Sequence, residues 1–403
     1  MKQWNLAKRT TLTAIAAGCA VFLAGCGGAS DGADTTPKTI APSFKVFGDS
    51  LMDSGSFGHK VTIQSSDPTT SFMVFPELVA ANMGVGKLCS FFNYSTTTAT
   101  STTATFSTQS TCTNYAVAGS RVNNLTNSTS PSNSSPLSIL YQIATAAPTL
   151  AATDVVMVDG GGNDMADLIG TYLRAGTATG VSNYSNLLGT LLPAATVSTL
   201  LGTTPTTTSM ATAAAAYAQA AAQALAASVR THIVAKGVTK VVVVNVPDVT
   251  TTPRFAAILA QVEATSGTAK REATQAAARS WLLAYNTALA QGLAGTNVQL
   301  FDLYAEGTRV TNNPAQYNLT NVTTPACPKV TGGTDSLGTA TLNLPATVAA
   351  CNTANLSANI PVGETSANWW QSYGYADNFH PTPALHKLIG QAINIQLAKA
   401  GWL

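Results

Sequence analysis

The chain has 403 residues, of which 45% are hydrophobic and only 9% are charged, against about 25% charged residues in an average globular domain. A chain of this length can bury a large core, and its net charge of +2 offers no basic stripe, which argues against a nucleic-acid-binding protein. The composition is that of a soluble globular protein with a neutral, hydroxyl-rich surface.

The first 26 residues have the features of an export signal. Three basic residues precede an apolar stretch, 12–24, that is too short to span a bilayer, as in a secretory signal peptide. The stretch ends in Leu-Ala-Gly-Cys, which resembles the lipobox of bacterial lipoproteins, where the chain is cut before a cysteine that then carries lipid. We therefore expect an exported protein of the bacterial cell envelope, with a lipid on Cys26 that anchors it to the outer membrane. Cleavage as an ordinary signal peptide would instead release it.

Residues 27–43 lack apolar periodicity and are rich in small and polar residues, so we expect a flexible tether. Residues 28–32 match the Gly-x-Ser-x-Gly pattern of a nucleophile elbow, but no predicted strand precedes them and no predicted helix follows. We interpret this match as chance. Residues 44–403 are expected to form a single domain.

Four cysteines lie outside the export signal, and in an exported protein they predict two disulfides. Three pairings are possible, and pairing of sequence neighbours joins Cys89 to Cys112 and Cys327 to Cys351, each closing a polar excursion. A metal site is the competing interpretation. We reject it because no two cysteines have the close spacing of a zinc site and the chain has only four histidines.

From residue 44 onward, short apolar runs alternate with helical stretches. Continuous apolar runs are typical of strands buried on both faces of a parallel sheet, and they occur at 44–47, 154–159, 240–246 and 298–303. Stretches rich in Ala, Gln and Leu predict helices at 210–235 and 270–293. This alternation predicts a doubly wound α/β sheet.

Polar excursions interrupt this pattern and are interpreted as insertions, at 89–112, 123–135, 175–209 and about 310–370. The third contains an apolar segment, 187–201. This segment either packs as core beneath its loop or forms a flap that faces the substrate, and core packing is the favoured interpretation.

A Gly-Asp-Ser-Leu sequence follows the first predicted strand. The carboxyl end of a strand opens onto the ligand crevice of a parallel sheet, and Gly48 allows a sharp turn that exposes the next side chains. Ser50 is therefore a candidate nucleophile. The competing interpretation is an ordinary turn rich in Asp and Ser.

A serine nucleophile needs a base and a group that orients the base. Two of the four histidines lie in predicted helices and a third follows the nucleophile loop, whereas His380 stands three residues after Asp377, just before the last helix. With this spacing Asp377 can orient His380 while His380 takes the Ser50 proton. Alternatively, Asp377 caps the last helix beside a surface histidine.

Two further segments offer hydrogen-bond donors at the same edge of the sheet. Asp-Gly-Gly-Gly-Asn-Asp follows the second predicted strand and leaves Asn163 with a side-chain amide to donate. Asn-Tyr-Ala-Val-Ala-Gly ends an apolar segment with Gly119, whose N–H can face the same crevice. The glycine-rich segment lacks the Gly-Lys-Ser/Thr ending of a phosphate-binding loop and the spacing of a dinucleotide-binding motif.

Taken in order, these segments resemble the GDSL esterases and lipases, also called SGNH hydrolases. The resemblance rests on four blocks, Gly48-Asp49-Ser50-Leu51, residues 114–119, Gly161-Gly162-Asn163-Asp164 and residues 377–381, and the segments 245–248 and 301–303 also resemble the spacing of that family. It implies a flavodoxin-like three-layer sandwich, with a parallel sheet between two layers of helices. It also implies a triad of Ser50, His380 and Asp377, with an oxyanion hole formed by the N–H groups of Ser50 and Gly119 and by the Asn163 side chain.

The implied activity is hydrolysis of a carboxylic ester through an acyl-enzyme, with no metal or organic cofactor. The expected partner is an ester substrate, a lipid or an acylated small molecule. Two alternatives remain open: a carbohydrate acetylesterase with the same site, and a non-catalytic surface binding protein built on a hydrolase fold. The hydroxyl-rich insertions leave the substrate undefined.

Overall fold

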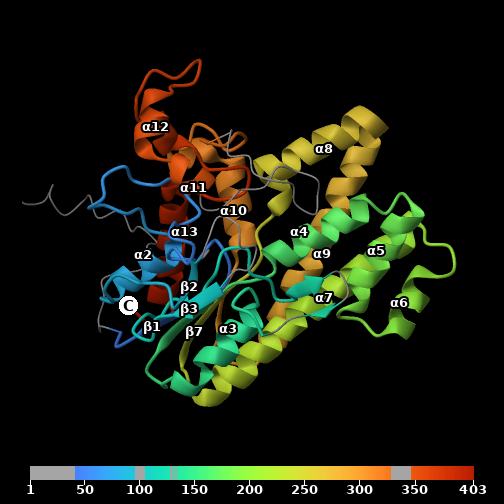
Figure 1. Ribbon diagram of the computed structural model, residues 1–403, viewed down its shortest axis with the longest axis horizontal. Helices are drawn as coiled ribbons and strands as arrows, with labels where there is room; N and C mark the ends of the chain where they lie inside the picture. Colours follow the sequence, from blue (N-terminus) through green and yellow to red (C-terminus); the bar gives the residue numbers. More distant parts are fainter. Residues whose placement is uncertain (1–40, 96–104, 128–129, 132–133, 328–345) are drawn as a thin grey trace, which may run out of the picture.

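The centre of the fold is a four-stranded parallel sheet, seen in a computed structural model that describes residues 41–95, 105–127, 130–131, 134–327 and 346–403 (Figure 1). The strand order is β1 (Phe44–Phe47), β6 (Val155–Val158), β7 (Lys240–Val244) and β8 (Gln299–Phe301). All neighbouring strands are parallel. The four predicted strands are thus confirmed, and all but the first are shorter than the predicted runs.

Helices cover both faces of the sheet, because alternate residues of each strand point to opposite sides. In β6, Val156 and Val158 pack into one apolar core, whereas Val155 and Met157 pack into the other. The first core lies under α3 (Ile139–Ala146), α4 (Gly162–Leu173), α7 (Thr207–His232) and α9 (Thr268–Leu293). The second lies under α2 (Phe75–Asn82), α10 (Leu303–Asn312) and α13 (Pro383–Lys399). The expected three-layer α/β sandwich is confirmed.

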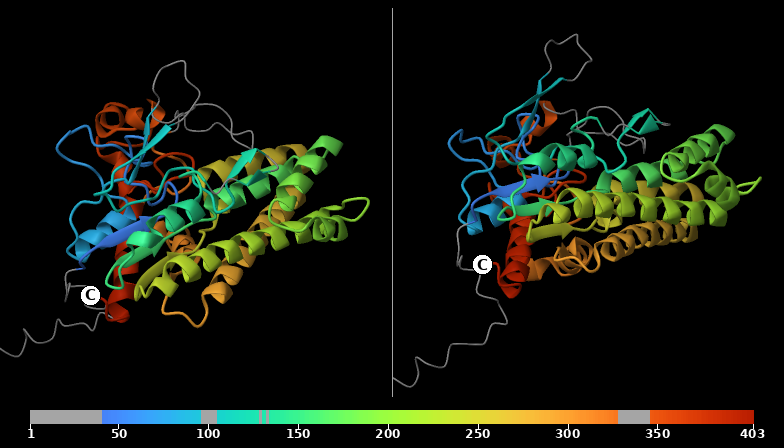
Figure 2. Two further views of the ribbon diagram at one scale, coloured as in Figure 1. Left: turned by 60° about the horizontal axis from the view of Figure 1, so that its bottom comes forward. Right: turned by 90° about the horizontal axis from the view of Figure 1, so that it is seen from below.

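The two long helices α7 and α9 run side by side and extend beyond the sheet (Figure 2). The Thr206 side chain accepts a hydrogen bond from the Ser209 N–H, and this cap starts α7 three residues before the predicted position. α8 (Pro253–Ser266) leads into α9 and likewise begins with a threonine cap, Thr252.

The excursion 175–209 is more ordered than a polar loop. It contains α5 (Ala178–Gly189) and α6 (Ala194–Leu201), which pack beside α7. Leu188 is fully buried and Val197 is 5% exposed in the same core. The apolar segment 187–201 therefore packs as core, as the favoured interpretation had it.

The remaining excursions, and several connections between the main helices and strands, hold short elements. Two antiparallel pairs are formed by β2 (Phe92–Ser95) with β3 (Thr105–Thr108) and by β4 (Leu125–Asn127) with β5 (Ser130–Pro131). The short helices are α11 (Ala346–Ala350) and α12 (Thr353–Ala358), together with the 3-10 turns η1 (Ala147–Thr149), η2 (Val234–Lys236), η3 (Val249–Thr251), η4 (Pro314–Tyr317) and η5 (Trp369–Ser372).

Both predicted disulfides are present. Cys89 bonds to Cys112, and Cys327 bonds to Cys351 inside a small apolar cluster that includes Trp369 and Trp370. Disulfides persist in oxidising compartments, which supports export of the protein.

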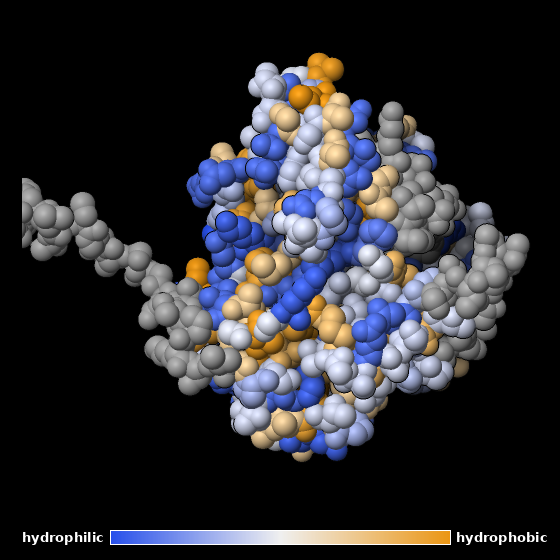
Figure 3. Space-filling view, turned by 60° about the vertical axis from the view of Figure 1, so that its left-hand side comes forward, coloured by the Kyte–Doolittle hydropathy of each residue, from blue (hydrophilic) through white to orange (hydrophobic). Residues whose placement is uncertain are grey.

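The molecular surface carries little hydrophobic area on the face shown in Figure 3, where hydrophilic and weakly polar residues enclose small hydrophobic groups. In the described part of the chain, the large hydrophobic side chains that stand exposed are Met73, Leu283, Ile360, Val362 and Ile395. No helix in those same residues is long and apolar enough to cross a membrane. The expected signal peptide with Cys26, and the tether up to residue 40, lie outside the described residues.

Candidate active site

The loop after β1 holds Ser50 at the carboxyl edge of the sheet. Gly48 is required here because a Cβ atom at this position would lie 1.7 Å from a carboxylate oxygen of Asp159, the residue that follows β6. The N–H groups of Met52 and Asp53 both donate to the Asp49 carbonyl, which closes a tight turn around Ser50. Ser50 is only 5% exposed.

A chain of two short hydrogen bonds links Ser50 to a histidine and an acid from the other end of the sequence. Ser50 Oγ lies 2.7 Å from His380 Nε2, and His380 Nδ1 lies 2.8 Å from Asp377 Oδ2. The second carboxylate oxygen, Asp377 Oδ1, accepts the N–H groups of Phe379 and His380, each at 2.7 Å. The structure therefore brings together the three residues that the sequence selected.

The Asp377 carboxyl is held in its charged form. Burial by itself would raise its pKa, but the neighbouring His380 and the two backbone donors outweigh burial, so the pKa of Asp377 is lowered. The competing interpretation, in which Asp377 caps the last helix, is wrong. The cap of α13 is Thr382, whose side chain accepts the Leu385 N–H.

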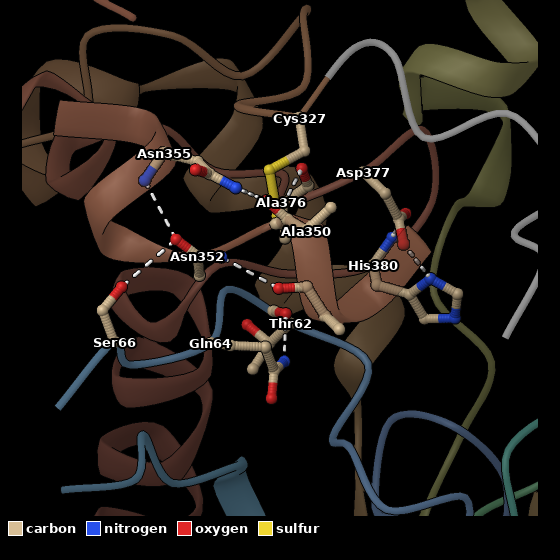
Figure 4. Close-up of a disulfide and its surroundings, with 12 residues drawn as sticks. Thr62, Gln64, Ser66, Cys327, Ala350, Asn352, Asn355, Ala376, Asp377 and His380 are labelled. Carbon is tan, nitrogen blue, oxygen red and sulfur yellow. Dashed lines mark hydrogen bonds and ion pairs between the residues drawn. A yellow bond between two sulfur atoms is a disulfide. The ribbon is translucent and has the colours of Figure 1, made fainter. Parts of the chain in front are cut away.

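The loop that carries Asp377 and His380 is held by the second disulfide (Figure 4). Cys327 donates its N–H to the Ala376 carbonyl at 2.8 Å, and Ala326 donates to the Tyr375 carbonyl at the same distance. Figure 4 shows Ala376 between the disulfide and the Asp377–His380 pair. Sequence reasoning paired these cysteines but gave no sign that they support the histidine loop.

Two backbone N–H groups in the loops of the site have no acceptor within the described residues. Among the described residues, neither the Ser50 N–H nor the Gly119 N–H donates a hydrogen bond to the chain. Gly119 has φ +82°, a left-handed conformation that favours glycine. Its neighbouring peptides are fixed, since the Ala118 N–H donates to Asp53 Oδ2 at 2.9 Å and Arg121 Nη1 donates to the Gly119 carbonyl at 2.7 Å.

Asn163 lies in the first turn of α4, close to the nucleophile loop. The helix is capped by Gly161 with φ +105°, and a Cβ atom there would lie 2.4 Å from the Tyr285 ring. Asn163 Nδ2 donates to the Ser120 carbonyl at 2.9 Å and has a longer contact of 3.5 Å with Asp49 Oδ2. One N–H of the amide is thus well bonded, while the other has only the long contact.

Two buried carboxyl groups lie beneath the nucleophile, and sequence reasoning assigned no role to either. The Asp49 N–H donates to Asp159 Oδ1 at 3.0 Å, and Asp159 Oδ2 is buried with no partner in the described part of the chain. Burial raises the pKa of Asp49. Burial and the charge of Asp49 raise the pKa of Asp159 well above its usual value. Asp49 accepts the Leu51 N–H and does not contact the Ser50 hydroxyl.

No group of three His, Cys, Asp or Glu side chains within the described ranges is arranged to hold a metal ion. The arrangement is instead suited to covalent chemistry on a carbonyl group. It combines a hydroxyl bonded to an imidazole, a carboxylate behind the imidazole, and two backbone N–H groups without an acceptor in the described loops around the site.

Comparison with known families agrees with this geometry. The chain matches the family model described as GDSL-like Lipase/Acylhydrolase over residues 45–393, a range that includes every loop of the site. No curated protein matches the chain.

Proposed function

The chain belongs to the GDSL-like lipase and acylhydrolase family, and from this premise we propose that it hydrolyses carboxylic esters through a triad of Ser50, His380 and Asp377. The family supports a serine acylhydrolase. The observation that carries the residue assignment is the continuous path of hydrogen bonds, 2.7 and 2.8 Å long, from the Ser50 hydroxyl through the His380 ring to Asp377.

In the first step, Ser50 Oγ attacks the ester carbonyl carbon while His380 Nε2 takes the hydroxyl proton. The carbonyl oxygen becomes an oxyanion. His380 then gives the proton to the alcohol oxygen, the C–O bond breaks, and the alcohol leaves an acyl group on Ser50. Water then attacks this acyl group while His380 takes one of its protons. His380 returns that proton to Ser50 Oγ as the bond between Oγ and the acyl carbon breaks, and the acid is released. Asp377 stays ionised throughout and stabilises the imidazolium, in line with its lowered pKa.

The oxyanion is stabilised by three donors: the N–H groups of Ser50 and Gly119, and the Asn163 amide. Support comes from the two N–H groups that have no acceptor in the described part of the chain, and from the amide N–H that has only a 3.5 Å contact. Donors that are fixed before the reaction stabilise the developing charge at no cost of reorganisation.

Replacement of Ser50 tests this proposal directly. Ser50→Ala abolishes hydrolysis of a short-chain nitrophenyl ester while the thermal unfolding transition remains, because the side chain makes no contact that the core requires. A fluorophosphonate probe labels the wild type at Ser50 and leaves the variant unlabelled. Turnover that persists in Ser50→Ala contradicts the assignment. Absence of labelling in the wild type points to the non-catalytic binding protein, and activity confined to sugar acetates points to the carbohydrate acetylesterase.

The cellular setting is part of the proposal. We infer a signal peptide at 1–26, a tether at 27–43 and a catalytic domain at 44–403, with Cys26 carrying a lipid that anchors the protein to the outer membrane. The two disulfides support export. Metabolic labelling with a fatty acid tests the anchor: label on the wild type that is lost in Cys26→Ser supports it, and an unlabelled wild type contradicts it.

A further inference from the structure

A cavity lies beside the nucleophile, beneath the loop that carries His380. Its walls come from five parts of the chain: the nucleophile loop, the connection from β7 to α8, α10, the histidine loop and α13. The side chains that line it are mainly apolar, and they include Leu51, Leu303, Val310, Phe379, Leu385 and Ile389.

Three residues of the cavity wall are chain neighbours of the two catalytic residues. Leu51 directly follows Ser50, and Phe379 and Pro381 stand on either side of His380. Neighbouring Cα atoms are about 3.8 Å apart, and the two catalytic side chains meet at 2.7 Å. Neither Ser50 nor His380 lines the cavity, but its wall lies within one residue of each of these two residues, whose side chains meet where the ester bond is cut.

The charges on the cavity wall are already neutralised. Asp248 pairs with Arg279 at 2.8 Å and also accepts the Thr250 N–H and hydroxyl. Glu306 pairs with Arg309 at 2.5 Å. A ligand in this cavity would meet apolar side chains and no unpaired charge on the described residues that line it, so the cavity favours a hydrocarbon group over an ionic one.

We propose that this cavity binds the hydrocarbon chain of the ester substrate. The inference rests on the ester hydrolysis proposed above and adds the chemical class of the group next to the scissile bond. The volume is about 70 Å³, roughly half of the ~150 Å³ that admits benzene in an engineered apolar cavity. It therefore suits a short straight chain and excludes a bulky ring. This hydrocarbon chain belongs either to the acyl group or to the alcohol of the ester, and the experiment below distinguishes the two.

Gly307 provides a way to fill the cavity without disturbing the core. On α10 the lining residues follow the helical repeat, at positions 303, 306, 307, 310 and 311, so position 307 lies in the middle of the face turned to the cavity. A Cβ atom at Gly307 would meet no atom within 4 Å. Gly307→Ala and Gly307→Leu thus occupy increasing parts of the cavity, and both changes favour the helix.

The experiment measures kcat/KM for two series of esters, nitrophenyl esters of acids of increasing length and acetate esters of alcohols of increasing length. In the series whose chain enters the cavity, kcat/KM of the wild type rises about fourfold for each methylene group and levels off after two to three groups. In Gly307→Leu the ratio of the four-carbon to the two-carbon substrate falls about tenfold, and Gly307→Ala gives an intermediate value.

Gly189→Leu is the matched control. Gly189 also lies on a helix, α5, its Cβ would also meet no atom within 4 Å, and it faces a groove between α5 and α6 that shares no lining residue with the cavity. This variant keeps the wild-type ratio in both series. An unchanged ratio in both series for a folded Gly307→Leu overturns the inference while leaving ester hydrolysis intact. A wild type that hydrolyses no ester of either series overturns the proposed function as well.

Discussion

Removal of the Cys327–Cys351 disulfide tests how the histidine loop is held in place. The bond spans 24 residues, and the chain-entropy relation gives about 3.4 kcal/mol for a loop of this length. The Cys89–Cys112 bond spans 23 residues, so its expected contribution is nearly the same. The two double serine variants should therefore lose similar amounts of unfolding free energy, about 3 kcal/mol each.

Their effects on activity should differ. Cys327 and Ala326 hydrogen-bond to Ala376 and Tyr375, directly before Asp377, whereas Cys89 and Cys112 make no hydrogen bond to residues 375–381 within the described part of the chain. A displacement of about 1 Å in a catalytic group can cost on the order of a hundredfold in rate. We expect Cys327→Ser/Cys351→Ser to lower kcat tenfold to a hundredfold, with KM changed much less.

The assay combines urea unfolding with steady-state kinetics on a short-chain nitrophenyl ester, at a temperature where both double variants are folded. The Cys89→Ser/Cys112→Ser variant is the control for lost stability alone. Equal losses of kcat in the two variants would show that the loss of overall stability explains the effect, and not the position of the histidine loop. A folded Cys327→Ser/Cys351→Ser variant with wild-type kcat would refute the support of the loop by the disulfide.

Three further predictions follow from the site. Asn163→Ala removes one oxyanion donor and should lower kcat about a hundredfold to a thousandfold with little change in KM, measured by steady-state kinetics; a loss below threefold would contradict the role of the amide. Asp377→Asn should lower kcat about ten-thousandfold, because an amide N–H facing His380 Nδ1 selects the wrong tautomer, and its pH–rate profile checks this. Burial raises the pKa of Asp159 above 3.8 in the folded chain, so the folded state binds more protons than the unfolded chain and stability falls as pH rises through that window. Asp159→Asn should therefore raise the free energy of unfolding at pH 8 by about 1 kcal/mol or more, since each unit of raised pKa is worth about 1.4 kcal/mol. Urea titrations should show this gain shrinking toward pH 4. A gain that is the same at both pH values would contradict the raised pKa of the buried carboxyl group.

The strands, the long helices and the disulfide pairing could be predicted because each is encoded locally. A valine run such as 241–244 presents apolar side chains on both faces of a strand, which favours a sheet that is covered on both faces. The same local signals failed at α5 and α6. Their Thr, Ser, Asn and Gly residues have low helix propensity, and these helices form because they bury Leu187, Leu188 and Val197 against α7.

The supporting parts of the site could not be predicted, since they depend on contacts between distant segments. Asp53 accepts the N–H of Ala118, which lies 65 positions away in the sequence, and neither segment carries a pattern that predicts this contact. The cavity beside Ser50 is formed by five segments, and only the nucleophile and histidine loops among them belong to the four sequence blocks on which the family resemblance rests. Motif reading identified the reacting groups, and the tertiary structure was needed to find what surrounds them.

The direction of the strands also determines how the molecule is presented to its surroundings. β1 begins at Phe44 and ends just before the Ser50 loop, so the chain reaches the sheet at one edge and displays its nucleophile at the opposite edge. α13 runs back from the histidine loop and brings the C-terminus to the same edge as Phe44 (Figure 1). A purification tag, a solid support or the proposed lipid placed ahead of Phe44 would therefore be joined to the protein at the edge opposite its reactive hydroxyl, so that the attachment itself does not cover the site.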